Sequence, residues 1–161
     1  MIEKWPDYID VMASSISDNG GRSCVNASAV IVPKYSKEIA EALGKKLGPF
    51  KPLPIDDPNA VLSGFANPKM GEWIDSAIDA DLEDQGAADV TAPYRDGPRL
   101  EKAAGGTYLR PTVVHCESID HPLSNREFLC PYASVVEVPQ AEMLGSIGPT
   151  LVVTAITENE S

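Results

Sequence analysis

Residues 16–32 read ISDNGGRSCVNASAVIV, and this stretch decides the fold that the rest of the sequence must fit. Two adjacent glycines, Gly20 and Gly21, are a stop signal for the helical pattern that precedes them. The run SAVIV that follows is apolar and rich in β-branched residues, which predicts a buried strand. The stretch therefore predicts a helix, a turn and a strand in succession, with Cys24 in the turn.

The composition predicts one globular domain over residues 1–161. Of the 161 residues 43% are apolar, which is enough to build a core. The formal net charge is −11, and an acidic surface repels nucleic acids and anionic membranes. No apolar run has membrane-spanning length, and the beginning of the chain, MIEKWPDYID, lacks the features of a signal peptide. We expect no nucleic-acid or membrane partner.

The cysteine content indicates reduced thiols. Cys24, Cys116 and Cys130 are odd in number and irregularly spaced, so they give neither a disulfide framework nor a CxxC zinc pattern. Free thiols are typical of the cytoplasm. We therefore expect a cytoplasmic protein without a metal site.

Helical and strand patterns alternate along the chain, which favours an α/β domain. Five prolines between positions 49 and 68 predict an extended connector. Helices are expected over residues 5–19, 36–48, 69–87 and 140–148, and strands over 28–33, 105–116 (continuing through Pro111), 133–139 and 150–156.

Two of these helices carry detailed expectations. Ser36 can cap the second helix at its N-terminus. In the third helix the apolar residues are expected to face the core and the carboxylates to form a solvated face, which is favoured over a metal or catalytic cluster. The core residues are Met70, Trp73, Ile74, Ala77, Ile78 and Leu82, and the carboxylates include Asp75, Asp79, Glu83 and Asp84.

Cys24 is the first candidate for chemistry, and the residues alone leave two readings open. A thiolate in a glycine-flanked turn is a good nucleophile for carbonyls, and backbone N–H groups of the turn could face a developing oxyanion. A free cysteine is more often a small buried apolar residue. The negative end of the preceding helix disfavours a thiolate and Arg22 favours it, so the local sequence does not decide between them.

Other candidates are less specific. Glu127 could bind a ribose or act as a base, or it could be a surface glutamate paired with Arg126. His115 and His121 flank Cys116 and could activate a thiol, although no motif links either of them to Cys24. Gly105–Gly106 is too sparse for a phosphate-binding loop and predicts a turn.

Three blocks together resemble the aldehyde dehydrogenase superfamily. The first is the cysteine signature, here Gly21–Arg22–Ser23–Cys24 followed by small residues. The second is GGTYLRPTVV, which resembles the family's Gly-Gly, aromatic, Pro-Thr-Val block, and the third is EFLCPYASVVEV. The sequence departs from the family at four positions: Arg22 for Gln or Glu, Ser17 for an aromatic or apolar residue, Leu129 for Phe, and Cys130 for Gly.

The resemblance implies the cysteine-bearing catalytic domain, with a three-layer-like α/β fold in which helices flank a central, mostly parallel sheet. It implies that Cys24 attacks an aldehyde, that its backbone N–H stabilises the oxyanion, and that a thioester forms after hydride transfer to NAD or NADP. It assigns Glu127 to the nicotinamide ribose and Leu129 to the position beside the nicotinamide ring.

The resemblance also predicts what this chain lacks. The family's nucleotide-binding domain, general-base Glu and oxyanion-stabilising Asn have no counterpart in the 161 residues. We therefore expect a fragment that is inactive alone, that could pair with a nucleotide-binding domain in trans, and that self-associates as a homo-oligomer near residues 150–156. A non-catalytic binding or oligomerisation module and a cofactor-free thiol esterase are the alternatives.

Overall fold

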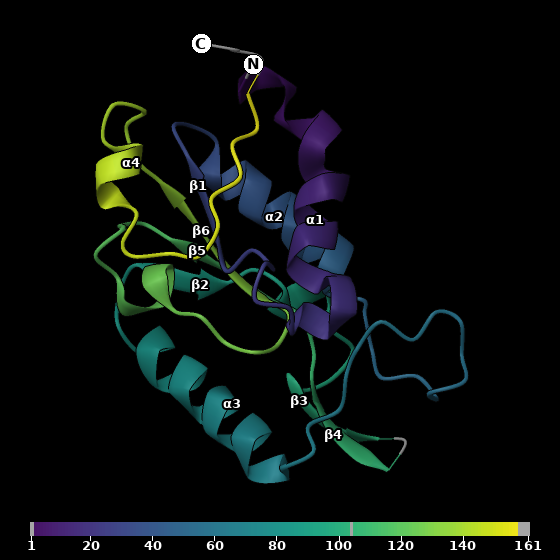
Figure 1. Ribbon diagram of the computed structural model, residues 1–161. Helices are drawn as coiled ribbons and strands as arrows, with labels where there is room; N and C mark the ends of the chain where they lie inside the picture. Colours follow the sequence, from purple (N-terminus) through teal and green to yellow (C-terminus); the bar gives the residue numbers. More distant parts are fainter. Residues whose placement is uncertain (1, 104, 158–161) are drawn as a thin grey trace.

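A computed structural model describes residues 2–103 and 105–157 of the chain as an α/β structure (Figure 1). Short 3-10 helices, marked η, accompany the α-helices and strands. In chain order the elements are η1 (Ile2–Tyr8), α1 (Ile9–Ser17), η2 (Asp18–Gly21), β1 (Ala29–Val32), α2 (Ser36–Leu47), α3 (Pro68–Leu82), β2 (Ala87–Asp89), η3 (Ala92–Tyr94), β3 (Leu100–Ala103), β4 (Gly106–Leu109), β5 (Thr112–Cys116), η4 (Pro122–Asn125), β6 (Tyr132–Glu137) and α4 (Met143–Ser146).

The central sheet has the strand order β1-β6-β5-β2. Strands β1 and β5 both run parallel to β6, whereas β2 is antiparallel to β5 at the edge. The prediction of a mostly parallel sheet with flanking helices is confirmed. Strands β3 and β4 form a separate two-stranded sheet, which projects below the central sheet in Figure 1.

Alternation along the central strands divides the core into two halves. Val113 and Val135 point to one face and belong to the cluster that α1 and α2 cover. Val114 and Val136 point to the other face and belong to the cluster that includes Ile74 of α3. Because successive strand residues face opposite sides, the consecutive valines of β5 and β6 supply apolar side chains to both halves of the core.

The helix expected over residues 5–19 is α-helical only in α1, between the 3-10 helices η1 and η2, and α2 follows its expected pattern with one correction. Ile39, Leu43 and Leu47 of α2 are fully buried. Ser36, however, does not cap α2, because it is the first helical residue and Tyr35 occupies the cap position in a left-handed conformation. The carboxylate of Glu137 accepts a hydrogen bond from the Ser36 backbone N–H at 3.5 Å instead.

Helix α3 differs more from its prediction. Ile74 and Ile78 are buried, but Met70 and Trp73 are 49% and 58% exposed and do not belong to the core. The carboxylate face is also not simply solvated, because Asp75 and Asp79 both bind the buried guanidinium of Arg99, at 2.7 and 2.5 Å. The predicted core face is thus narrower than its apolar pattern indicated, with Ile74, Ile78, Ala77 and Leu82 in or against the core, and its carboxylate side binds a buried cation.

The strand predicted through Pro111 is divided into two strands of different sheets. Strand β4 ends at Leu109 and β5 begins at Thr112. Pro111 has no N–H to contribute to a ladder. Arg110 is 2% exposed and turns inward, where it donates to the carbonyl oxygens of Phe50 and Gly48 and pairs with Asp96.

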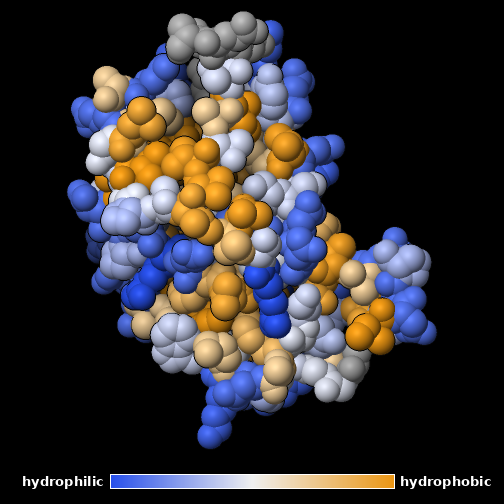
Figure 2. Space-filling view, viewed as in Figure 1, coloured by the Kyte–Doolittle hydropathy of each residue, from blue (hydrophilic) through white to orange (hydrophobic). Residues whose placement is uncertain are grey.

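The strand predicted over residues 150–156 is absent from the structure, which has this segment in an irregular conformation. Its apolar side chains remain exposed, from 42% for Ile156 to 73% for Leu151. No neighbouring strand of the described residues supplies a ladder for it, and a β-branched sequence forms a strand only when it has a partner. Figure 2 shows a broad hydrophobic area in the part of the surface where this segment runs in Figure 1.

Replacing Arg110 with Met should lower the free energy of unfolding by about 3–5 kcal/mol, because the substitution leaves buried acceptors without a donor. Urea denaturation monitored by circular dichroism measures the change. Lys102→Met is the matched control, because Lys102 pairs with Glu72 at an exposed site and should cost less than about 1 kcal/mol. Equal losses in the two variants would contradict the structural role assigned to Arg110.

Candidate functional site

The turn that carries Cys24 begins with three consecutive residues in the left-handed region. Their φ angles are 54° for Asn19, 67° for Gly20 and 66° for Gly21. This conformation suits glycine and is tolerated by asparagine, which explains the order of residues at the end of α1. Ser17 also belongs to the helix end, where its hydroxyl donates to the Ala13 carbonyl at 2.9 Å.

Asn26 holds the turn in place, although no motif of the sequence assigned it this role. Its side-chain oxygen accepts a hydrogen bond from the Ser23 N–H at 2.7 Å. Its side-chain nitrogen donates to the carbonyl oxygens of Ser15 and Asp18, at 2.8 and 3.1 Å. The signal available in the sequence was an asparagine within a short polar turn, where this residue commonly bonds the backbone.

Cys24 is the exposed thiol of the chain. Cys116 and Cys130 are buried, and burial raises the pKa of their thiols to about 11 and about 12. Within residues 2–103 and 105–157, no acceptor is bonded to the Cys24 backbone N–H. The turn thus presents a sulfur and an unpaired N–H together, as the nucleophile reading of Cys24 requires.

The turn is pressed against the segment before β6. A Cβ atom placed on Gly21 would lie 2.4 Å from the Pro131 nitrogen and 2.5 Å from the Cys130 carbonyl carbon. Only glycine allows this approach. The contact joins the first and third sequence blocks, which are separated by more than a hundred residues in the chain.

A cavity of about 280 Å³ opens beside this contact. Glu127, Leu129 and Arg22 line it together, so the structure unites both residues assigned to the cofactor with the neighbour of the cysteine signature. Cys24 itself does not line this cavity. The remaining wall is apolar and consists of Phe65, Met70, Trp73, Ile74 and Phe128.

Arg22 is held by the proline-rich connector. Its guanidinium lies 4.4 Å from the centre of the Phe65 ring, and its Nη2 donates to the Ser63 carbonyl at 3.0 Å. The buried Nε atom has no hydrogen-bond partner among the described residues. These contacts anchor the connector across the cavity and account for the side chain without a contact to the Cys24 thiol.

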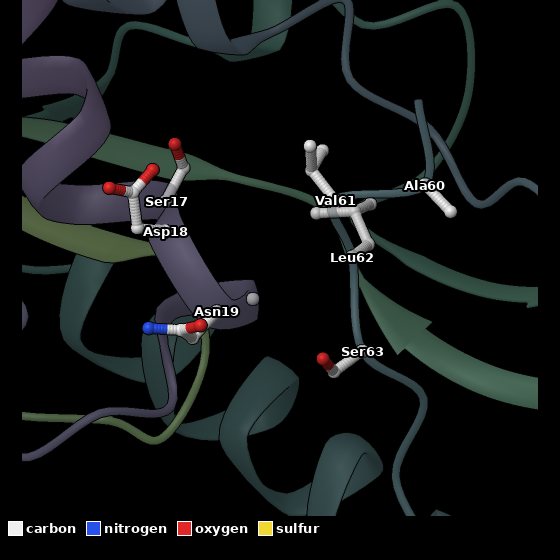
Figure 3. Close-up of a pocket in the computed structure, with 8 residues that line it drawn as sticks. Ser17, Asp18, Asn19, Ala60, Val61, Leu62 and Ser63 are labelled. Carbon is white, nitrogen blue, oxygen red and sulfur yellow. The ribbon is translucent and has the colours of Figure 1, made fainter. Parts of the chain in front are cut away.

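A second cavity, of about 440 Å³, lies between the end of α1 and the connector (Figure 3). Ser17, Asp18 and Asn19 stand on one side of it, and Val61, Leu62 and Ser63 stand on the other. Gly20 also lines it, and a Cβ atom on this residue would lie 2.5 Å from the Ser63 hydroxyl oxygen. The connector therefore contributes to both cavities around the cysteine turn.

The two histidines form hydrogen bonds away from the cysteine turn. His115 Nε2 lies 3.2 Å from the Ser36 hydroxyl oxygen, and His121 Nδ1 accepts a hydrogen bond from the Leu123 N–H at 3.1 Å. Neither is joined to Cys24 by a hydrogen bond in the described part of the chain. Across those residues there is also no group of three or more His, Cys, Asp or Glu side chains that could hold a metal ion. No helix in the same ranges is long and apolar enough to cross a membrane.

Comparison with solved structures identifies the fold of this chain. The chain has the fold of part of an aldehyde dehydrogenase, as the three sequence blocks predicted. No protein-family model matches the chain, and no curated protein matches it. The likeness is therefore one of structure, at low sequence identity.

Three of the similar structures illustrate it. An NAD+ complex of an aldehyde dehydrogenase from Bacillus cereus is 18% identical with a TM-score of 0.71, over 89% of this chain and 28% of that chain. A succinic semialdehyde dehydrogenase from Streptococcus pyogenes in complex with NADP+ is 21% identical with a TM-score of 0.68, over 87% and 30%. A methylmalonate-semialdehyde dehydrogenase from Oceanimonas doudoroffii is 13% identical with a TM-score of 0.72, over 89% and 30%. The chain thus spans less than a third of the length of these three enzymes.

Replacing Gly21 with Ala should destabilise the chain strongly, because the new Cβ meets the backbone of Cys130 and Pro131 at a left-handed position. We expect a loss of more than about 3 kcal/mol in the free energy of unfolding. Gly105→Ala is the matched control. Its φ is +77° but no atom lies within 4 Å of the new Cβ, so only the conformational cost of about 1 kcal/mol should appear. Similar midpoints of urea denaturation for the two variants would contradict the close approach.

Proposed function

We propose that this chain is the cysteine-bearing catalytic domain of an NAD(P)-dependent aldehyde dehydrogenase, with Cys24 as its nucleophile. The observation that carries the proposal is the contact of Gly21 with Cys130 and Pro131. It places the exposed thiol turn beside the cavity that Glu127 and Leu129 line. The fold of the similar solved structures supports the same conclusion.

The reaction begins at the Cys24 sulfur. Its thiolate attacks the carbonyl carbon of an aldehyde, a C–S bond forms, and the carbonyl oxygen becomes an alkoxide. The free backbone N–H of Cys24 is the donor that this chain offers to the alkoxide. Exposure of the thiol at the surface of the turn gives the aldehyde access without any movement of the core.

The residues around the cavity of about 280 Å³ fit one end of a dinucleotide. The Glu127 carboxylate can accept hydrogen bonds from ribose hydroxyls, and the 60% exposed Leu129 offers an apolar surface for a flat ring. A bound nicotinamide supplies a hydride acceptor to such a site. Arg22 stands in the wall of the same cavity, where it brings a positive charge close to the ring position.

A non-catalytic binding module is the second candidate, and the departures at Arg22 and Leu129 favour it. Arg22 spans the cavity wall to Phe65 and Ser63 and so restricts the space in which a cofactor ring would lie. For the enzymatic function we propose a nucleotide-binding domain in trans, and for either function self-association as a homo-oligomer. The exposed apolar segment 150–156 supports self-association.

Iodoacetamide should alkylate Cys24 and leave Cys116 and Cys130 unmodified in the native chain, because burial and a raised pKa protect the latter two. Peptide mapping by mass spectrometry locates the label. The native Cys24→Ala variant should take up no label, and in urea the wild-type chain should label at all three positions. Equal labelling of Cys24 and Cys116 in the native chain would contradict the assignment of Cys24.

Mixing the chain with a separately produced aldehyde dehydrogenase nucleotide-binding domain tests the enzymatic proposal. We expect NADH formation from a short aldehyde only in the mixture, and none with Cys24→Ala. Glu127→Gln should raise the KM for NAD by roughly tenfold, the effect of losing about 1.4 kcal/mol of hydrogen bonding. Neither a complex nor turnover in the mixture would favour the non-catalytic module, and NADH formation by the chain alone would contradict the proposed need for a nucleotide-binding domain in trans.

A further inference from the structure

Three polar side chains meet at one edge of the central sheet. The proposed aldehyde dehydrogenase function assigns no role to any of them. Ser36 follows β1, His115 is the next-to-last residue of β5, and Glu137 is the last residue of β6. These three strands are parallel neighbours, so their carboxyl ends lie together, the edge where open α/β sheets place their ligand sites. Cys24 precedes the amino end of β1 and belongs to the opposite edge.

Ser36 stands at a strained turn between a strand and a helix. Tyr35 has a φ of 65°, a conformation that costs a bulky residue about 1–3 kcal/mol and that proteins retain mainly at functional positions. The next residue, Ser36, opens the 12-residue helix α2. In the nucleophile elbow of many hydrolases the serine also lies between a strand and a helix, although there the strained residue is the serine itself and here it is Tyr35, directly before it.

The hydroxyl of Ser36 lies within hydrogen-bond distance of an imidazole and of a carboxylate. Its oxygen lies 3.2 Å from His115 Nε2 and 3.5 Å from Glu137 Oε2. The shorter contact is to the imidazole, as proton transfer from serine to histidine requires. The Glu137 carboxylate is fixed in turn by the Ser36 backbone N–H.

His115 has the charge state that a base needs. Burial lowers the pKa of the imidazole below its usual value, so the ring is neutral at pH 7. The Glu117, Glu137 and Glu38 carboxylates oppose that shift and Lys37 adds to it. The same three carboxylates stabilise the imidazolium that forms when the ring takes up a proton.

We propose that Ser36 and His115 form a second reactive site, which hydrolyses small carboxylic esters independently of Cys24. The Ser36 oxygen attacks the ester carbonyl while its proton moves to His115 Nε2. The bond from the carbonyl carbon to the leaving oxygen then breaks, and the departing alcohol takes the proton from His115. Water hydrolyses the acyl-Ser36 ester with His115 again as base, which releases the acid and restores the serine.

Hydrolysis of p-nitrophenyl acetate by the full chain carrying Cys24→Ala tests this site without interference from the thiol. We expect Ser36→Ala and His115→Gln, each added to Cys24→Ala, to lower kcat by at least about 100-fold. Ser76→Ala in the same background is the matched control, since its hydroxyl bonds only the Glu72 carbonyl on an exposed helix face, and it should keep the full rate. The rate with Ser36 present should fall at acidic pH as His115 becomes protonated, with a midpoint below the ordinary histidine pKa of about 6.5 because burial lowers the pKa of this ring.

A covalent probe removes any dependence on the folding of Ser36 variants. Diisopropyl fluorophosphate should phosphorylate Ser36 in the native Cys24→Ala chain, with loss of fluoride and transfer of the proton to His115. Mass spectrometry of the peptides should show the adduct at Ser36 and not at Ser76. Absence of an adduct at Ser36, or equal ester turnover by the Ser36→Ala and Ser76→Ala variants, would overturn the proposal. Either result would leave unaffected the separate prediction that iodoacetamide alkylates Cys24 in the wild-type chain.

Discussion

The approach of Gly21 to the backbone of Cys130 and Pro131 is the constraint on which the candidate site depends. One loop leads into β1 and the other into β6, and these two strands are hydrogen-bonded neighbours. The register of the parallel pair therefore fixes the distance between the loops, and the missing side chain allows it to be short. The thiol of Cys24 and the carboxylate of Glu127 take their relative positions from this contact rather than from any direct bond.

Buried arginines hold distant segments of the chain together away from the site. Arg110 bonds two carbonyls at the start of the connector, and Arg99 is bound by two carboxylates of α3. Both guanidinium groups are buried, and each pairs with a carboxylate that stays largely exposed, Asp79 for Arg99 and Asp96 for Arg110. Each arginine makes several charge-assisted hydrogen bonds, which offsets the cost of removing its charge from water. The connector, which has little secondary structure of its own, keeps its course through such contacts.

The local patterns were sufficient to predict most of the fold. Helices α1 and α2, strands β1 and β6, and the mostly parallel sheet were predicted because their apolar periodicity coincides with their burial. Predictions that depended on distant partners were wrong. Trp73 is exposed although it lies on the apolar stripe of α3, and residues 150–156 have no strand to pair with among the described residues. Of the site, Cys24, Glu127 and Leu129 were predicted from the sequence blocks, whereas Asn26 and the path of Arg22 to Phe65 became visible only in the structure.

The distribution of the three thiols has a consequence for oxidation. Cys24 is exposed, while Cys116 and Cys130 are enclosed by the core on the opposite side of the sheet from α1 and α2. A sulfenic acid formed at Cys24 would therefore meet no exposed cysteine of its own chain among the described residues. The partners left to it are small thiols such as glutathione and the Cys24 of a second copy. Peroxide would thus convert a surface nucleophile into a covalent link between molecules, and a reductant would restore both.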